Sequence, residues 1–258
     1  MDEQPDVILE PLPSVEEPGK PGKVRKVFSV AIATLASVAL FVAVLLTCLQ
    51  IVAFDEGYYA AQQQKLGLDA VAGVSKEDMG RIMHELLLYC QGDRANLDMQ
   101  AVINGQPREV FNQREKDHMV DVQVLFTRVI KLRLILVASF LFLALMLVYV
   151  ARKRTLRELA RGWLIAVAVL GAVLLAIGIY FAVDFEAAWT QFHLIFFTND
   201  LWLLYEDDML IQLLLPLFDG IVRSVLIWSG AVLAVITAGA VFVMQRTGKK
   251  LDAGKSKA

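Results

Sequence analysis

The chain has 258 residues, of which 57% are hydrophobic and 20% are charged, and its formal net charge at pH 7 is −2. Soluble globular domains are less apolar, at about 45–50%, and keep their apolar residues in short periodic runs. The long apolar runs of this chain therefore exclude a water-soluble enzyme, and its balanced charge gives no basic surface for nucleic acid. Two cysteines, Cys48 and Cys90, are too few for a disulfide framework or a zinc site.

Four segments contain no charged residue and are long enough to cross a bilayer: 27–54, 134–151, 162–183 and 224–245. A transmembrane helix needs about 20 apolar residues. Because the bilayer core holds no water that could bond the backbone, each of these segments must be helical. The sequence therefore predicts an all-α polytopic membrane protein with four transmembrane helices.

Lysine and arginine residues cluster next to three ends of these spans, in residues 20–26, 152–161 and 246–258. All three segments fall on the same side of a four-span chain, and basic residues favour the cytoplasmic side. The pattern predicts cytoplasmic termini. Residues 1–26, which are rich in proline and acids, are expected to form a disordered cytoplasmic tail.

The remaining segments, 55–133 and 184–223, then face outward. The first is too long for a simple connection, so we expect it to form a small structured cap that ends in an interfacial helix. Three basic residues beside the second span go against this orientation: Arg128, Lys131 and Arg133.

Local signals within the cap predict one helix and one tight turn. Ser75 precedes acidic residues in the manner of a helix start, apolar residues then recur on one face, and Gly92 follows as a stop signal. The pair Asn104-Gly105 favours a tight turn and a short hairpin.

A second cap helix is expected to start near Asn112. His118, Val122 and Leu125 share its apolar face, which is typical of a helix lying flat on the bilayer before the chain turns down into the second span. In this interpretation His118 points toward lipid, and Asp121 lies within reach of its imidazole.

The second outward segment is expected to be an aromatic loop at the membrane interface, where tryptophan and tyrosine are favoured. Residues 209–218 are apolar but too short to span, so they are interpreted as interfacial or re-entrant, and Pro216 as a kink or stop. His193 lies among aromatic residues that could flank an acyl chain: Trp189, Phe196, Phe197 and Trp202.

His118 and His193 both fall at the expected headgroup level, and imidazole can act as acid or base near neutral pH. On pattern alone, two interfacial side chains with polar tips are the simpler interpretation. His84 is interpreted as a solvated helix position, and Tyr89 as packing or as part of the site. The sequence has no Gly-x-Ser-x-Gly motif and offers no covalent serine or cysteine nucleophile.

Two segments carry a resemblance to a known family. Residues 115–122 read Glu-Lys-Asp-His-Met-Val-Asp-Val, and residues 192–202 read Phe-His-Leu-Ile-Phe-Phe-Thr-Asn-Asp-Leu-Trp. The chain resembles, from the first span to the fourth, the Lit family of lipoprotein intramolecular transacylases, which are four-span bacterial membrane proteins.

This resemblance implies an acyltransferase of the bacterial cell membrane that acts on diacylglyceryl-modified lipoproteins. The amine of the lipidated cysteine would attack its own sn-2 ester and give the lyso form, with His118 and His193 as the catalytic pair and no cofactor or metal. One histidine would take the ammonium proton and the other would assist at the ester oxygen. The supporting residues are Asp121, which would orient His118, Asn199, which would stabilise the oxyanion, Asp200 and Tyr89.

Other classes remain open. A non-enzymatic assembly or lipid-binding protein would use the same aromatic residues but would tolerate His→Gln at both sites. Another lipid acyltransferase or hydrolase could use the same histidines. A transporter ranks lower, because the four spans contain no ionisable Asp, Glu, Lys, Arg or His.

Overall fold

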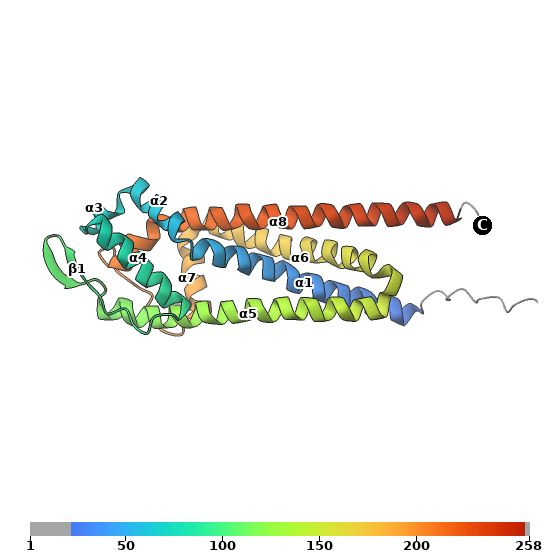
Figure 1. Cartoon of the computed structure of the whole chain (residues 1–258), viewed down its shortest axis with the longest axis horizontal. Coiled ribbons are helices and arrows are strands. Elements are labelled where there is room, and N and C mark those ends of the chain that lie inside the picture. Colours follow the sequence, from blue (N-terminus) through green and yellow to red (C-terminus); the bar gives the residue numbers. More distant parts are fainter. Residues whose placement is uncertain (1–21, 256–258) are drawn as a thin grey trace, which may run out of the picture.

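The computed structural model describes residues 22–255, in which long helices run side by side and the smaller elements gather at one end (Figure 1). Most of the predicted tail, residues 1–21, lies outside the described part of the chain, as do residues 256–258. Residues 23–26, which the prediction assigned to that tail, are already helical. The long helices are α1 (Lys23–Ala53), α5 (Gln113–Ala151), α6 (Thr155–Val183) and α8 (Met209–Lys255).

The cap, residues 55–112, consists of three helices and one pair of strands. They are α2 (Glu56–Leu66), α3 (Leu68–Ala72), α4 (Lys76–Gln91), β1 (Gln100–Ile103) and β2 (Gln106–Glu109). One further helix, α7 (Phe185–Phe196), follows α6 at the same end of the bundle (Figure 1).

Three segments of the described chain are long and apolar enough to cross a membrane: Val24–Ala53, Gln113–Val183 and Met209–Gly248. The second contains two helices, α5 and α6, joined by the short 3-10 turn η1 (Arg152–Arg154). Arg152 has φ 51° and ψ −121°, a non-helical conformation that ends α5, and the chain reverses there. The predicted basic loop 152–161 is therefore shorter than expected, because α6 already begins at Thr155.

Close helix crossings hold the bundle together. A Cβ atom on Gly162 of α6 would lie 2.5 Å from the carbonyl carbon of Ala33 on α1, so only glycine permits this approach. The indole Nε1 of Trp163 donates a hydrogen bond of 3.0 Å to Thr237 of α8. These contacts fix α1 and α8 on either side of α6.

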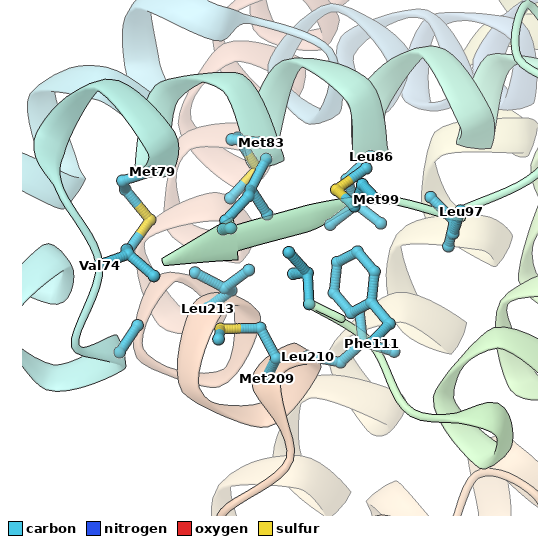
Figure 2. Packing of buried hydrophobic residues seen from close by; sticks show 14 of the residues in the cluster. Val74, Met79, Met83, Leu86, Leu97, Met99, Phe111, Met209, Leu210 and Leu213 are labelled. Atoms are coloured by element: carbon cyan, nitrogen blue, oxygen red, sulfur yellow. The ribbon is translucent and has the colours of Figure 1, made fainter. Parts of the chain in front are cut away.

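The cap has its own hydrophobic core, which it shares with the start of α8. Figure 2 shows Met83 and Leu86 of α4 facing Phe111 and Leu213 across strand β1, with Met99 just before that strand. Phe111 and Leu213 are fully buried. The cap is therefore packed onto the bundle by the same helix, α8, that runs along it.

The local predictions in the cap are confirmed. Ser75 caps α4 by accepting a hydrogen bond from the amide of Asp78, and the helix ends at Gly92 with φ 88°. The hairpin turn uses Asn104 and Gly105 with φ 52° and 78°, which is the geometry of a type I′ turn.

The prediction of a separate surface helix before the second span is wrong. α5 is one continuous helix of 39 residues that starts in the cap and runs the length of the bundle (Figure 1). Its sequence contains neither glycine nor proline, so nothing in the chain favours a turn between the amphipathic part and the apolar part. His118 is 8% exposed and faces protein rather than lipid.

The helix that contains the predicted last span, residues 224–245, is longer than that span. α8 begins at Met209 rather than at residue 224, and it continues beyond residue 246 to Lys255. Pro216 lies inside this helix, where it removes one backbone hydrogen bond without ending the helix. The predicted loop 184–223 consists of α7, the connecting loop 197–208 and the first turns of α8.

Candidate functional site

The structure brings His118 of α5 and His193 of α7 together. Their ring centroids are 6.4 Å apart and the ring planes are inclined by 40°. Both side chains are buried, with 8% and 5% of their surface exposed. The two rings are therefore neighbours, close enough to act on the same substrate molecule.

His193 is held in a defined orientation. Its Nδ1 lies 2.8 Å from the carbonyl oxygen of Trp189, one turn earlier in α7. Since a carbonyl only accepts, Nδ1 carries the proton and Nε2 of the neutral ring presents a lone pair. Burial lowers the pKa of His193 below the ordinary histidine value of 6.5 and outweighs the hydrogen bond to Trp189, which raises the pKa. His193 is therefore neutral at pH 7 and able to accept a proton.

His118 has a different environment. The edge of its ring meets Phe197 at a centroid distance of 5.3 Å, and its Nδ1 is buried without a hydrogen-bond partner among residues 22–255. Asp121 accepts a hydrogen bond of 2.8 Å from the amide of Asn199, and not from His118. No protein group in the described chain thus fixes the tautomer of His118, and the side chain of Asn199 is already engaged.

Aromatic side chains enclose His193. Trp202 stacks on the imidazole at 4.6 Å, Trp189 lies at 4.5 Å, and Phe197 touches both histidines. Phe196 does not join this group, because it packs on Phe192 and is half exposed. The exposed face of α7 continues with two aliphatic residues, Leu194 and Ile195. A lipid chain could therefore approach along this face.

Two other candidate residues, Tyr89 and Asp200, and the third histidine lie outside the pair. Tyr89 is buried in the core of the cap, and its backbone carbonyl accepts a hydrogen bond from Gln123. The side chain of Asp200 is 79% exposed and lies 3.9 Å from Arg114. Nδ1 of His84 lies 2.9 Å from a carboxylate oxygen of Glu56, and both side chains are exposed on the outside of the cap.

Sequence analysis missed a buried polar junction beside the pair. Glu115 is 1% exposed, and its two carboxylate oxygens accept hydrogen bonds of 2.7 Å from the amides of Asn112 and Leu210. Asn112 in turn donates to Asp208, which is 7% exposed, immediately precedes α8 and also accepts a hydrogen bond from the amide of Tyr205. The junction therefore locks the N-termini of α5 and α8 together, three residues from His118. The capping-box pattern of Asn112 and Glu115 was the available signal.

The described residues contain no group of three or more His, Cys, Asp or Glu side chains placed to hold a metal ion. Two cavities occur elsewhere. One, of about 320 Å³, lies between α2 and α4, and the other, of about 160 Å³, lies among α1, α6 and α8. Neither cavity is lined by His118 or His193. The imidazole pair is the candidate site because imidazole can both accept and donate a proton near neutral pH.

Comparisons with known proteins identify a family and similar solved structures. The profile of the family "Lipoprotein intramolecular transacylase Lit" matches residues 34–218, a range that includes both histidines. The solved structure of the membrane-integral lipoprotein intramolecular transacylase Lit from Bacillus cereus is similar, with a TM-score of 0.62 and 15% identity over 90% of this chain and 100% of that one. A variant of the same protein with one histidine replaced by arginine has a TM-score of 0.67 and 14% identity over 87% and 96% of the two chains. A comparison with curated protein sequences gives no match. Because the family profile matches more than half of this chain, the chain belongs to the Lit family of lipoprotein intramolecular transacylases.

Proposed function

We propose that this protein moves the sn-2 acyl chain of an S-diacylglyceryl cysteine to the α-amino group of the same cysteine. The product is an N-acyl, S-monoacylglyceryl lipoprotein, the lyso form, and the enzyme is an O-to-N acyltransferase. Membership of the Lit family supports the substrate class. The observation that carries the mechanism is the buried imidazole pair, whose ring centroids lie 6.4 Å apart.

In this mechanism His193 is the general base. The hydrogen bond from Nδ1 to Trp189 leaves Nε2 as the accepting atom. The substrate amine attacks the ester carbonyl carbon, and Nε2 removes a proton from the amine as the new N–C bond forms. A neutral base is required, and the lowered pKa of His193 keeps the ring neutral at pH 7.

His118 assists at the leaving oxygen. When the C–O bond of the ester breaks, the glyceryl oxygen takes up a proton and becomes a hydroxyl group. Because no described protein group fixes the tautomer of His118, its ring can accept a proton on one nitrogen and release one from the other. The proton removed from the amine can thus reach the glyceryl oxygen through the pair.

No protein nucleophile is needed, because the substrate supplies both reacting groups. Holding them in one molecule and in one orientation provides a large part of the rate enhancement. The cysteines do not compete for this role: both are buried, and burial raises the pKa of Cys90 to about 12, which keeps it a thiol.

The proposed topology has four spans, formed by α1, α5, α6 and α8, with both termini in the cytoplasm and the imidazole pair outside. It is supported by the three apolar segments, of which the second contains two antiparallel helices, and by the basic residues around η1. In this arrangement the exposed apolar face of α7 lies in the outer leaflet. Trp189, Phe197 and Trp202 then line the path of the acyl chains, with Phe196 at the lipid boundary.

The three histidines allow a matched test. His118→Ala, His193→Ala and the control His84→Ala are expressed in a bacterium that lacks transacylase activity, and its lipoproteins are analysed by mass spectrometry. We expect the lyso form with wild type and with His84→Ala, because His84 lies outside the pair. We expect its loss in both other variants. A normal level of lyso form with either His118→Ala or His193→Ala would exclude the two-histidine mechanism.

A further inference from the structure

Loop 197–208, which connects α7 to α8, is fastened to the first turns of α5. Arg114 makes two of these contacts: its Nε donates a hydrogen bond of 3.1 Å to the carbonyl of Leu203, and its Nη2 donates to the carbonyl of Asp200. Both acceptors are backbone atoms, so Arg114 fixes the path of the main chain.

The two carbonyls flank the residue that stacks on His193. Trp202 lies between Asp200 and Leu203, its ring stacks on the imidazole at 4.6 Å, and its Nε1 donates to the carbonyl of Asn199. Arg114 lies four residues before His118, one helical turn away on α5. One helical segment therefore carries the first imidazole and holds the loop that covers the second.

We propose that Arg114 is a positioning residue for the imidazole pair. It fixes loop 197–208 so that Trp202 stays on His193, and this contact keeps His193 buried and directed at His118. Arg114 itself does not touch the substrate. The inference rests on the proposed function, because it names the group that sets the geometry of that site.

The chemistry of the contact requires arginine. A guanidinium group presents several N–H donors in a rigid plane and can hold two carbonyls at once, whereas a lysine ammonium is a flexible point charge. The ion pair between Arg114 and Asp200 is a weaker candidate for this role. Its side chains are 36% and 79% exposed, and exposed ion pairs stabilise little.

The first experiment measures turnover of a synthetic diacylglyceryl lipopeptide by purified Arg114→Met and Arg114→Lys. The control is Arg108→Met, because Arg108 is an exposed arginine on β2. We expect kcat to fall about ten- to hundredfold in Arg114→Met, and less in Arg114→Lys, because a small displacement of catalytic groups costs this much. We expect KM to stay within about twofold and the Arg108→Met control to match wild type. Values of kcat in Arg114→Met equal to those of Arg108→Met would overturn the inference.

A second readout does not depend on activity. Protonation of His193 should quench the stacked Trp202, so tryptophan fluorescence of wild type should fall as the pH drops through the pKa of His193. Trp202→Phe identifies this component by removing it. Arg114→Met should reduce its amplitude, and an unchanged amplitude would contradict the inference. Failure of the proposed function gives a different result. His193→Ala would then keep its activity, while in proteins that retain His193 the fluorescence change would still depend on Arg114.

Discussion

Replacing Glu115 by glutamine tests the buried junction that joins α5 to α8. In the wild type each carboxylate oxygen accepts a backbone N–H at 2.7 Å, from Asn112 and from Leu210. Glutamine keeps one accepting oxygen and turns a donor group toward the other N–H. One buried amide then loses its partner, which costs about 1–3 kcal/mol of unfolding free energy.

For a chain of this length such a loss lowers Tm by about 2–12 °C, at about 2–4 °C per kcal/mol. Thermal unfolding of the detergent-solubilised protein measures the change, and Glu206→Gln is the matched control. Glu206 is exposed, so its substitution should change stability by no more than about 0.5 kcal/mol. Equal melting temperatures for the two variants would refute the assignment of Glu115 as a buried cap of α8.

Two further predictions follow from the packing. Trp202→Ala uncovers His193, so the pKa of His193 should rise toward 6.5. Since the neutral base is the active form, the acid limb of the pH–rate profile should move to higher pH; an unmoved limb would count against His193 as the base. Gly162→Val places side-chain atoms against the backbone of Ala33 and should destabilise the protein by about 1–3 kcal/mol. Gly171→Val is the control, because a Cβ atom at Gly171 meets open space and should not destabilise the protein. Similar unfolding curves for the two variants would argue against the tight α1–α6 crossing.

The parts of the fold that could be predicted depend on residues close together in sequence. Ser75 and Gly92 mark the ends of α4 by local hydrogen bonding and a left-handed conformation, and Asn104-Gly105 determines its turn by the same kind of constraint. The absence of charge over about 20 residues likewise identifies apolar helices without any knowledge of their neighbours.

The errors arose where one pattern fits two environments. An apolar stripe on the start of α5 is expected both for a helix on a bilayer and for one packed against protein. The sequence does not distinguish them, and the stripe in fact includes Met119 in the cap core. Pro216 similarly permits either a stop or a continued helix.

The candidate site could be predicted only in part for a related reason. His118 and His193 are 75 residues apart, and no local pattern indicates that their rings lie together. Only the resemblance of the surrounding segments to the Lit family indicated that they form a pair. Asp208 follows two other acids, a pattern that is typical of a solvated segment. Its burial results from a bond to Asn112, 96 residues earlier, which is not visible in a linear pattern.

The central claim is that the imidazole pair transfers an acyl group within one lipidated cysteine. The most direct test incubates the purified protein with a diacylglyceryl lipopeptide whose sn-2 acyl chain alone carries an isotope label, mixed with an unlabelled peptide of different mass. Mass spectrometry should find the label on the α-amino nitrogen of the same peptide, together with a free sn-2 hydroxyl group. Label released as free fatty acid, or label found on the second peptide, would contradict the account.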